Sequence, residues 1–520
     1  MTDEKKKILW VDDEIDLLRP HILFLEERGY SVTSVTNAED AIEMTKKQDF
    51  DLILLDEMLH GIDGLTALTE LKEIKPGLPV IMVTKSEEET LMEEAIGAKI
   101  DDYLTKPVNP SQILLVCKKI LEGSKFTGEK LSRDYTAEFN KISTRIMGQT
   151  AWQDWIDIHI KLSQWDVELD HYPDLGLKHT LYDQKRDCNA EFGRFIENHY
   201  MEWLMGDDRP PLSVDIVPKF VLPSVQGGKQ TILLIIDNLR LDQWMVVEPL
   251  LHNYFHAHRD YHYSILPTAT PYSRNSIFSG LFPAEIERIM PELWKTGEEE
   301  DEYSRNRHEL PLLEAQLKRL NIELKPSPKY AKILDIGESR NVARRIHEYA
   351  DTPLSAIVYN FVDILAHTRS SSDLIKEMIP NEAAYRSMTR SWLRHSHLFA
   401  ALRQLAESGN TVIITSDHGS IRGTRGAKVI GDRETSTSLR YKYGRNLKVK
   451  TKNAMFIKDP RKYKLPARGV NTNYIIAKED YYFVYPTNYH YYLNYYADSF
   501  QHGGISLEEM ILPVITLEPK

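Results

Sequence analysis

The sequence predicts a multidomain α/β protein built from three parts, and three observations support this class. The first 122 residues alternate short apolar runs with amphipathic helical runs. Residues 123–208 show helical periodicity without a strand-like run, and four prolines follow within 209–228. The remaining residues, 209–520, contain three continuous apolar runs that each end beside acidic or histidine residues. Strands that alternate with helices indicate parallel sheets covered by helices.

Length and composition exclude several classes of protein. A chain of 520 residues has room for about three domains, and its 42% hydrophobic and 27% charged residues exclude a mainly disordered chain. No apolar run approaches the ~18 residues that a membrane span needs. Cys117 and Cys188 are the only cysteines, which excludes a disulfide framework and fits a reducing cytoplasm. The net charge of −12 argues against a protein that simply coats nucleic acid.

Polar residues end the strands expected in the first part. The apolar runs 7–11, 51–55 and 79–83 lead to Asp12 and Asp13, to Asp56 and to Thr84, and Lys106 precedes Pro107. Because ligands bind at the carboxyl ends of parallel strands, these side chains should share one edge of the sheet. Three carboxylates there suit Mg²⁺, and Asp56 can then act as a nucleophile toward a phosphoryl group.

This ordered set resembles the receiver domain of two-component response regulators, which implies a flavodoxin-like fold with a parallel five-stranded sheet over residues 1–122. The resemblance assigns Mg²⁺ to Asp12, Asp13 and Asp56, phosphorylation to Asp56, and switch roles to Thr84, Tyr103 and Lys106. It also implies a cis peptide bond before Pro107. One departure is visible, since His60 stands where the family usually has proline.

The middle part, residues 123–208, is expected to form a helical bundle linker. Apolar residues recur there at spacings of three and four, at Trp155, Ile158, Leu162, Trp165 and Leu169. Such a stripe is more often helix packing than a binding groove.

The third part brings candidate metal ligands to the ends of its expected strands. Runs 231–236, 354–361 and 411–415 are followed by acidic and histidine residues, and a His-Gly-Gly sequence lies near the C-terminus; the candidates are Asp237, Asp363, His367, Asp417, His418 and His502. Asp363 and His367 are four apart, so one helical turn places both on the same face. Imidazole and carboxylate ligands suit zinc, and a single histidine taken alone would more often be an ordinary polar residue.

A hydroxyl nucleophile lies between these ligand groups. Thr268 and Thr270 precede a helical run, and a helix N-terminus favours a bound phosphate. A plain helix-capping role is the alternative for either threonine. With metal ligands around it, we favour Thr270 as the nucleophile and keep Thr268 as the second choice.

The order of these residues resembles the alkaline phosphatase superfamily, and the runs 268–280 and 502–509 resemble its PglZ branch. By that resemblance Asp237, Thr270, Asp417 and His418 bind one zinc ion, and Asp363, His367 and His502 bind the other. Arg274 and Asn275 are candidates for substrate binding. Manganese or iron in place of zinc remains an alternative.

Two further patterns concern the substrate. Residues 422–468 hold 15 Lys or Arg and 3 Asp or Glu, a net charge of +12. Eight tyrosines crowd 481–496. A basic surface and aromatic rings favour a polyanion such as an oligonucleotide. The alternatives are a solvated surface that balances acidic runs such as 298–302, and tyrosines half-buried in a sheet.

A receiver joined through helices to a PglZ domain resembles the PorX response regulators. That resemblance implies a sensor histidine kinase as partner, a homodimer on phosphorylation, zinc-dependent phosphodiesterase activity on linear or cyclic oligonucleotides, and control of type IX secretion. No helix-turn-helix is evident, so direct sequence-specific DNA binding is not expected. The main alternative is a phosphorylation-controlled binding platform with structural zinc, acting on a partner such as a sigma factor. A simple phosphomonoesterase is a weaker alternative, which the basic segment disfavours.

Overall fold

The structure, a computed structural model, describes residues 5–85, 100–121, 123–206, 208–294, 306–432, 438–467, 469 and 471–520. The chain divides into two compact units, Met1–Tyr135 and Thr136–Lys520. Most of the helical part expected at 123–208 therefore shares a unit with the C-terminal part of the chain.

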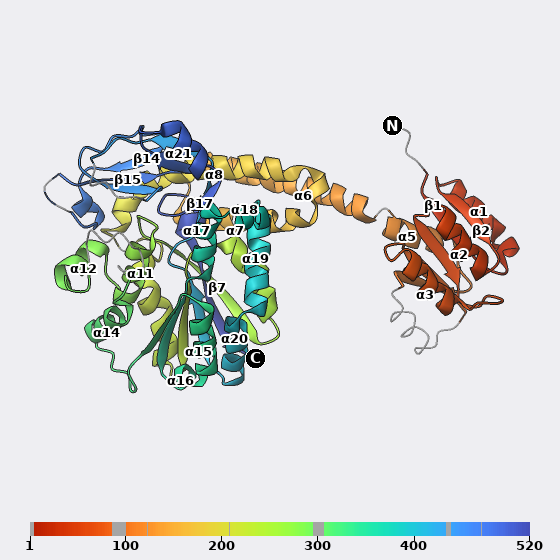
Figure 1. The fold of residues 1–520 in the computed structure, drawn as a ribbon, viewed down its shortest axis with the longest axis horizontal. Coiled ribbons are helices and arrows are strands. Elements are labelled where there is room, and N and C mark those ends of the chain that lie inside the picture. The colour runs from red at the N-terminus through yellow and green to blue at the C-terminus, as the bar shows by residue number, and fades with distance from the viewer. Residues whose placement is uncertain are drawn as a thin grey trace. The chain divides into compact units, whose positions relative to one another are not determined.

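The first unit is built on a five-stranded parallel sheet in the order β2-β1-β3-β4-β5 (Figure 1). The strands are β1 (Lys7–Val11), β2 (Ser31–Val35), β3 (Leu52–Asp56), β4 (Val80–Thr84) and β5 (Asp102–Thr105). Strands β3 and β4 are buried along their whole length, as their unbroken apolar sequences predict.

Helices cover both faces of this sheet. They are α1 (Arg19–Glu26), α2 (Ala38–Lys47), α3 (Gly64–Ile74) and α5 (Pro110–Leu121). Residues of α2 and α3 form a core with Leu9 and Ile53 on one face, and residues of α1 and α5 form a core with Ile8 and Leu54 on the other. This arrangement confirms the flavodoxin-like fold expected for the first part.

Three long helices follow, namely α6 (Gly123–Ile146), α7 (Trp152–Glu168) and α8 (Leu177–Trp203). Four members of the expected apolar stripe are buried, at Trp155, Ile158, Leu162 and Leu169. Trp155 packs its ring against Phe192 of α8 at 5.3 Å between centroids. The stripe is therefore helix packing, as expected.

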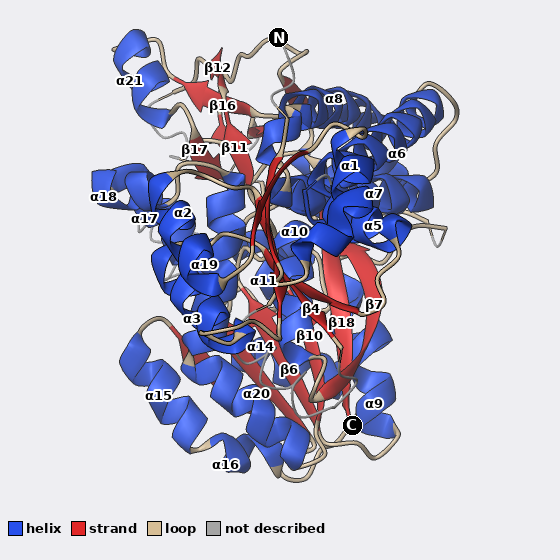
Figure 2. Ribbon diagram, turned by 90° about the vertical axis from the view of Figure 1, so that its right-hand side faces the viewer, coloured by secondary structure: helices blue, strands red, loops and turns tan. Residues whose placement is uncertain are grey.

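The second unit contains a six-stranded mixed sheet in the order β7-β18-β10-β6-β9-β8 (Figure 2). The strands are β6 (Thr231–Ile236), β7 (Phe255–Tyr263), β8 (Lys329–Ile333), β9 (Leu354–Tyr359), β10 (Thr411–Thr415) and β18 (Ile511–Pro519). The three apolar runs expected as strands are the parallel neighbours β10, β6 and β9 at its centre, and β18 pairs antiparallel with β10 and β7.

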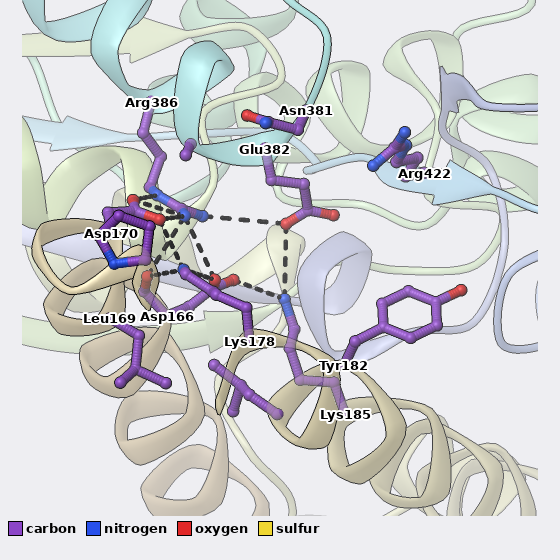
Figure 3. A pocket seen from close by; sticks show the side chains of 13 residues that line it. Asp166, Leu169, Asp170, Lys178, Tyr182, Lys185, Asn381, Glu382, Arg386 and Arg422 are labelled. Atoms are coloured by element: carbon purple, nitrogen blue, oxygen red, sulfur yellow. Dashed lines mark hydrogen bonds and ion pairs between the residues drawn. The ribbon is translucent and has the colours of Figure 1, made fainter. Parts of the chain in front are cut away.

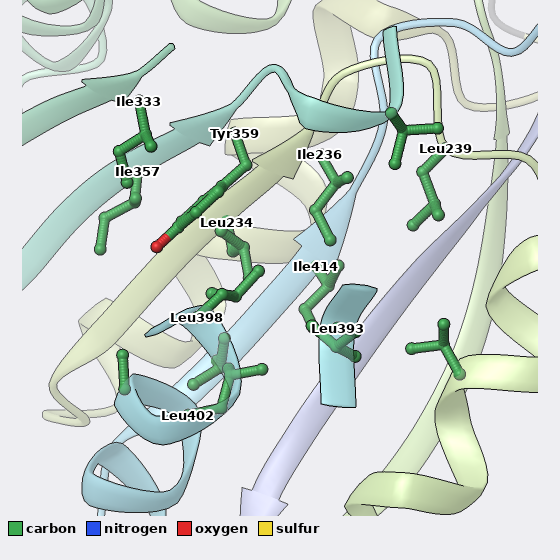
Figure 4. Packing of buried hydrophobic residues seen from close by; sticks show 14 of the residues in the cluster. Leu234, Ile236, Leu239, Ile333, Ile357, Tyr359, Leu393, Leu398, Leu402 and Ile414 are labelled. Carbon is green, nitrogen blue, oxygen red and sulfur yellow. The ribbon is translucent and has the colours of Figure 1, made fainter. Parts of the chain in front are cut away.

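Helices pack on one face of this sheet around a large apolar core (Figure 4). They are α10 (Leu241–Val247), α15 (Ile336–Arg344), α16 (Ile346–Ala350), α19 (Glu382–His395) and α20 (His397–Glu407). Leu234 and Ile236 of β6, Ile357 of β9 and Ile414 of β10 meet Leu398 and Leu402 of α20 there. Because this core fixes neighbouring strands, it also fixes where their carboxyl ends lie.

The other elements of this unit are short. The helices are α9 (Leu222–Gln226), α11 (Thr270–Ser279), α12 (Pro283–Ile289), α14 (Glu309–Arg319), α17 (Phe361–Ser371), α18 (Asp373–Met378), α21 (Tyr489–Tyr496) and α22 (Leu507–Met510). The strands form three small sheets, β11 (Ile421–Gly423) with β17 (Ser499–Gln501), β12 (Arg425–Lys428) with β16 (Tyr481–Val484), and β13 (Tyr441–Gly444), β15 (Asn473–Ala477) and β14 (Ala454–Ile457). None of the helices in the described part of the chain has both the length and the apolar character needed to cross a bilayer.

Candidate functional site

The first unit gathers its acidic residues at the carboxyl edge of the sheet. Asp12 follows β1, Asp56 ends β3, and Lys106 follows β5. The Lys106 Nζ atom lies 2.9 Å from Asp12 Oδ2 and 2.7 Å from Asp56 Oδ2. One oxygen atom from each of Asp12, Asp13 and Asp56 lies within 4.8 Å of the others. This all-oxygen set fits Mg²⁺.

The environment of Asp56 opposes its charge. Burial raises the pKa of Asp56, and the hydrogen bond from Lys106 lowers it in part. Its Oδ1 atom is buried and has no hydrogen-bond partner among the described residues. A divalent cation at this edge would supply the missing positive charge.

Of the three expected switch residues, Lys106 contacts Asp56, whereas Thr84 contacts Glu57 and Tyr103 is exposed. Thr84 Oγ1 donates a hydrogen bond to the carboxylate of Glu57, and Tyr103 is 43% exposed. The Lys106–Pro107 peptide bond is cis. His60 is exposed and its Nε2 atom lies 3.4 Å from Asp13 Oδ2. Glu57 is a contact of the switch hydroxyl that the sequence reading missed.

In the second unit, one cluster forms where β6, β10 and α11 meet. Asp237 follows β6, Asp417 and His418 follow β10, and Thr270 is the first residue of α11. Thr270 Oγ1 and His418 Nε2 are 2.9 Å apart. Asp237 Oδ1 and Asp417 Oδ2 lie 3.6 Å and 3.9 Å from the same nitrogen. Four ligand-type atoms thus surround one point, as the sequence predicts for the first metal site.

The buried oxygen atoms of this cluster fit a metal ion. Asp237 Oδ1 and Asp417 Oδ2 have no hydrogen-bond partner among the described residues. Burial, followed by the charge of Asp417, raises the pKa of Asp237 well above its usual range. Burial lowers the pKa of His418 to about 4, so its imidazole is neutral near pH 7 and free to act as a ligand. Two buried carboxylates and a neutral imidazole are a donor set that zinc accepts.

A second cluster joins α17 to the segment after β17. Asp363 and His367 lie one turn apart on α17, and His502 follows β17. The Nε2 atoms of His367 and His502 are 3.2 Å apart, and they lie 3.4 Å and 3.7 Å from Asp363 Oδ1. Burial opposes the charge of Asp363, but the neighbouring His367, His502 and His418 lower its pKa. This second donor set also suits zinc.

The two clusters are adjacent. The rings of His418 and His502 stack with their centroids 4.1 Å apart and their planes within 13°. Ligands expected from three strand ends and one helix are therefore gathered at one edge of the sheet, as in other α/β folds.

Polar residues behind the ligands hold them in place. Arg274 is buried, and its guanidinium lies 2.6 Å from Asp237 Oδ2 and 2.5 Å from Glu309 Oε1. Asn360 donates to Asp237 Oδ2 at 2.8 Å, and Asn238 donates to Asp363 Oδ1 at 3.2 Å. The structure thus places Arg274 between two carboxylates, where its contacts are structural. Glu309 and Asn360 were missed by the sequence reading.

The other two candidate residues make local contacts. Thr268 donates from Oγ1 to the Gly504 carbonyl at 2.8 Å and accepts from the Gly503 amide at 3.2 Å. Asn275 donates from Nδ2 to the Pro271 carbonyl at 3.0 Å and accepts from Asn306 at 3.3 Å. Thr268 thus contacts the loop after His502, and Asn275 contacts its own helix and the neighbouring Asn306.

A third group of acids in this unit is an ion-pair network. It consists of Asp166, Asp170, Asp242 and Glu382 with Lys178, Lys185, Arg240 and Arg386. All of these except Asp242 and Arg240 line a pocket of about 300 Å³ beside α7, α8 and α19 (Figure 3). Because each acid already faces a cation, we read this group as structural despite its carboxylate cluster.

The basic segment is partly neutralised by residues far away in the chain. Arg440 pairs with Glu509 in the interior, Arg422 with Asp498, Arg425 with Glu479 and Asp480, and Lys464 with Glu285. Exposed cations remain at Lys428, Arg445, Lys448, Lys450, Lys452, Lys458, Arg461 and Lys462. Residues 433–437 and 468 of this segment, and the acidic run 298–302, lie outside the described residues.

Comparisons with known families assign all three parts of the chain. A family model described as the BREX system PglZ alkaline phosphatase-like domain matches residues 217–517. The response regulator receiver domain matches residues 8–118, and the PorX response regulator linker domain matches residues 125–204.

Individual relatives cover the receiver part. The transcriptional regulatory protein ResD of Bacillus subtilis is 36% identical over 115 residues, which is 22% of this chain and 48% of ResD. SrrA of Staphylococcus aureus is 33% identical over 132 residues, which is 25% of this chain and 54% of SrrA. The chain thus matches about half the length of these curated relatives.

Solved structures also match the receiver part. The CheY-like receiver domain protein from Methanospirillum hungatei JF-1 is 31% identical and covers 23% of this chain and 95% of its own, with a TM-score of 0.22. The receiver domain of NtrX from Brucella abortus is 31% identical and covers 22% and 98%, with a TM-score of 0.21. The PglZ model spans more than half of the chain, so the protein belongs to the PglZ alkaline phosphatase-like family, and its three matched domains make it a PorX-type response regulator.

Proposed function

We propose that this response regulator carries a zinc-dependent phosphodiesterase in its PglZ domain, that Thr270 is the nucleophile, and that the substrates are linear or cyclic oligonucleotides. The observation that carries the proposal is the convergence of Thr270 Oγ1, His418 Nε2 and the orphaned oxygens of Asp237 and Asp417 beside the Asp363, His367 and His502 cluster.

The chain's own residues position a phosphodiester and its nucleophile. Thr270 begins α11, so the helix N-terminus with its backbone N–H groups lies beside its hydroxyl and favours a phosphate there. Zinc ions, held by the two clusters, would lower the pKa of the hydroxyl and stabilise charge on the phosphoryl oxygens. Thr268, which bonds to Gly503 and Gly504, fixes the loop after His502 and is not the nucleophile in this proposal.

Arg274 has a positioning role in this proposal and does not touch substrate. It holds Asp237 Oδ2, which leaves Asp237 Oδ1 directed to the metal cluster, and Glu309 anchors the other side of its guanidinium. Arg274→Lys cannot make both contacts in the same geometry. We expect this variant to bind less metal at the first cluster, measured by equilibrium dialysis against zinc, while Arg319→Lys on the nearby helix α14 should not.

Control of the enzyme belongs to the receiver domain in the same proposal. A sensor histidine kinase phosphorylates Asp56 with Mg²⁺ at Asp12, Asp13 and Asp56, and Thr84, Tyr103 and Lys106 respond to the new charge. Homodimerisation, control of type IX secretion, a cytoplasmic location and contact with a partner such as a sigma factor are further predictions from the PorX resemblance.

The test is hydrolysis of a bis-aryl phosphate and of short oligonucleotides, with metal content read on the same sample. Wild type should turn over both substrates, Thr270→Ala should lose hydrolysis while keeping its metal, and Thr270→Ser should retain part of it. The same assays with an acyl phosphate donor show whether Asp56 controls the rate. Full activity of Thr270→Ala would refute the assignment of the nucleophile.

A second function is favoured by one observation, the deep burial of the first metal cluster, in contrast to the exposed His367 of the second. Asp237, Asp417 and His418 are each at most 1% exposed, and Thr270 is 4% exposed. Closed sites are typical of structural zinc. Two bound metal ions without turnover on either substrate would therefore support a phosphorylation-controlled binding platform.

A further inference from the structure

Helix α21 presents an exposed double row of tyrosines. The rings of Tyr491 and Tyr495 stack at 6.0 Å between centroids, and those of Tyr492 and Tyr496 stack at 5.8 Å. Tyr491 is 63% exposed, Tyr495 45% and Tyr492 37%. The expectation that these tyrosines are half-buried in a sheet therefore does not describe this helix, because none of its residues is buried. We call these four residues the tyrosine rows.

The helix is anchored on another side. The Cδ1 atom of Leu493 packs against Gly426 of β12, at the place that a Cβ atom would occupy. Tyr482 of β16 donates from its hydroxyl to the Leu493 carbonyl at 2.6 Å. With Leu493 held against β12 and β16, the tyrosine rows remain on the exposed surface of a fixed helix.

The segment after α21 is tied to both metal clusters. Asp498 accepts hydrogen bonds from Arg369, two residues after His367, and from Arg422, four residues after His418. His502 is six positions after Tyr496, so their Cα atoms are at most about 20 Å apart. An oligonucleotide of a few residues can span that distance.

The surroundings suit an anion with aromatic bases. Residues 481–497 contain no acidic residue. Lys428 of β12 is exposed beside this segment, since it pairs with Val484 of β16. Exposed rings beside cations are how proteins bind single strands without reading their sequence.

We propose that the tyrosine rows of α21 stack the bases of a single-stranded oligonucleotide whose phosphodiester lies at the metal clusters. This proposal rests on the phosphodiesterase function proposed above and adds the residues that distinguish an oligonucleotide from a small phosphodiester.

The test is a binding cycle between rings and bases. Full-length protein carrying Thr270→Ala, which does not cut the probe, is titrated into a 5′-labelled oligothymidylate of about six residues and into an abasic strand of the same length. Fluorescence anisotropy should show that removing the bases weakens binding roughly tenfold or more. Adding Tyr491→Ala and Tyr495→Ala should remove that difference, whereas Tyr491→Phe and Tyr495→Phe, which keep the rings, should preserve it.

The outcomes separate this proposal from the enzyme assignment. Suppose that wild type hydrolyses oligonucleotides and that the double alanine variant keeps its preference for bases. That result would overturn the base-stacking role of the tyrosine rows but not the proposed phosphodiesterase activity. Absence of hydrolysis with any phosphodiester would overturn the proposed function. A third outcome is that the alanine variant loses self-association in sedimentation while its oligonucleotide binding stays unchanged in anisotropy. That result would assign the tyrosine rows to contact with a second copy of the chain and also overturn the proposal.

Discussion

Removing the guanidinium of Arg386 should destabilise the second unit by several kilocalories per mole. Arg386 is 1% exposed, and it lies 2.7 Å from Asp242 Oδ2 and 2.7 Å from Asp170 Oδ2. It also lies 3.2 Å from Asp166 Oδ1, so Arg386 joins carboxylates of three separate helical segments, each of which also faces a second cation. Figure 3 shows Arg386 of α19 directed toward Asp166 and Asp170.

The magnitude follows from the burial of the carboxylates. Removing one partner of a buried ion pair costs about 3–5 kcal/mol, and we apply this range because Arg386→Met takes a cation from three carboxylates at once, although Lys178, Lys185 and Arg240 still face them. Unfolding entropy near 2.1 cal/mol/K per residue gives roughly 0.8 kcal/mol/K for the unit Thr136–Lys520. Arg386→Met should therefore lower its Tm by about 4–6 °C.

Differential scanning calorimetry of the full chain measures this shift. Arg390→Met is the matched control, because Arg390 lies one turn further along α19 and is exposed, and its Tm should stay at the wild-type value. Arg386→Lys, which keeps the charge but loses the planar fork, should fall between the two. A Tm of Arg386→Met within about 1 °C of wild type would refute the view that this network stabilises the docking of α7 and α8.

Three further predictions concern pH, metal and the switch. Burial lowers the pKa of His159 to about 4, below the value of 6.5 for the unfolded chain, and the nearby charges of Glu508 and Lys185 oppose each other. As the pH falls from 6.5 toward 4, the unfolded chain takes up a proton that the folded chain does not, so the folded state loses stability. Between pH 7 and pH 5, the unfolding free energy of wild type should fall by about 2 kcal/mol more than that of His159→Leu, measured by urea titration. Equal losses in the two proteins would exclude His159 as the cause. Chelation by EDTA should lower the Tm of the second unit and zinc should restore it, because binding to the folded state alone stabilises that state; an unchanged Tm would argue against buried metal. Glu57→Ala removes the carboxylate that accepts the hydrogen bond from Thr84. Because one such hydrogen bond contributes about 1 kcal/mol, the Mg²⁺-dependent affinity for beryllofluoride should rise about fivefold in a titration. An unchanged affinity would show that Glu57 does not restrain the switch.

The positions of the metal-ligand candidates could be predicted because they follow from topology. Asp237 and Asp417 end neighbouring parallel strands, and the carboxyl ends of such strands share an edge. Glu309 could not be predicted, since it lies far along the chain from Asp237 and looks like an ordinary acidic residue at the start of a helix. Only its burial against Arg274 shows that it supports the site.

The tyrosine-rich segment shows where a pattern was ambiguous. Tyr481 and Tyr482 do lie in a strand, but Tyr491 and Tyr495 lie one turn apart on a helix. The spacing of four between these rings, repeated at Tyr492 and Tyr496, is a helical period that outweighed the general preference of tyrosine for strands. The ion-pair partners of the arginines in the basic segment could not be predicted, because partners such as Glu509 for Arg440 are distant in sequence.

The helices expected to link two domains also form part of the scaffold of the candidate metal site. Asn189 of α8 accepts from the Leu507 amide at 2.8 Å and donates to Glu508 at 3.0 Å, which holds the loop after His502. On the other side, the ion-pair network of α7 and α8 reaches Arg240, three residues after Asp237. Because α7 and α8 contact both ligand-bearing loops, a displacement of these helices acts on both metal clusters at once.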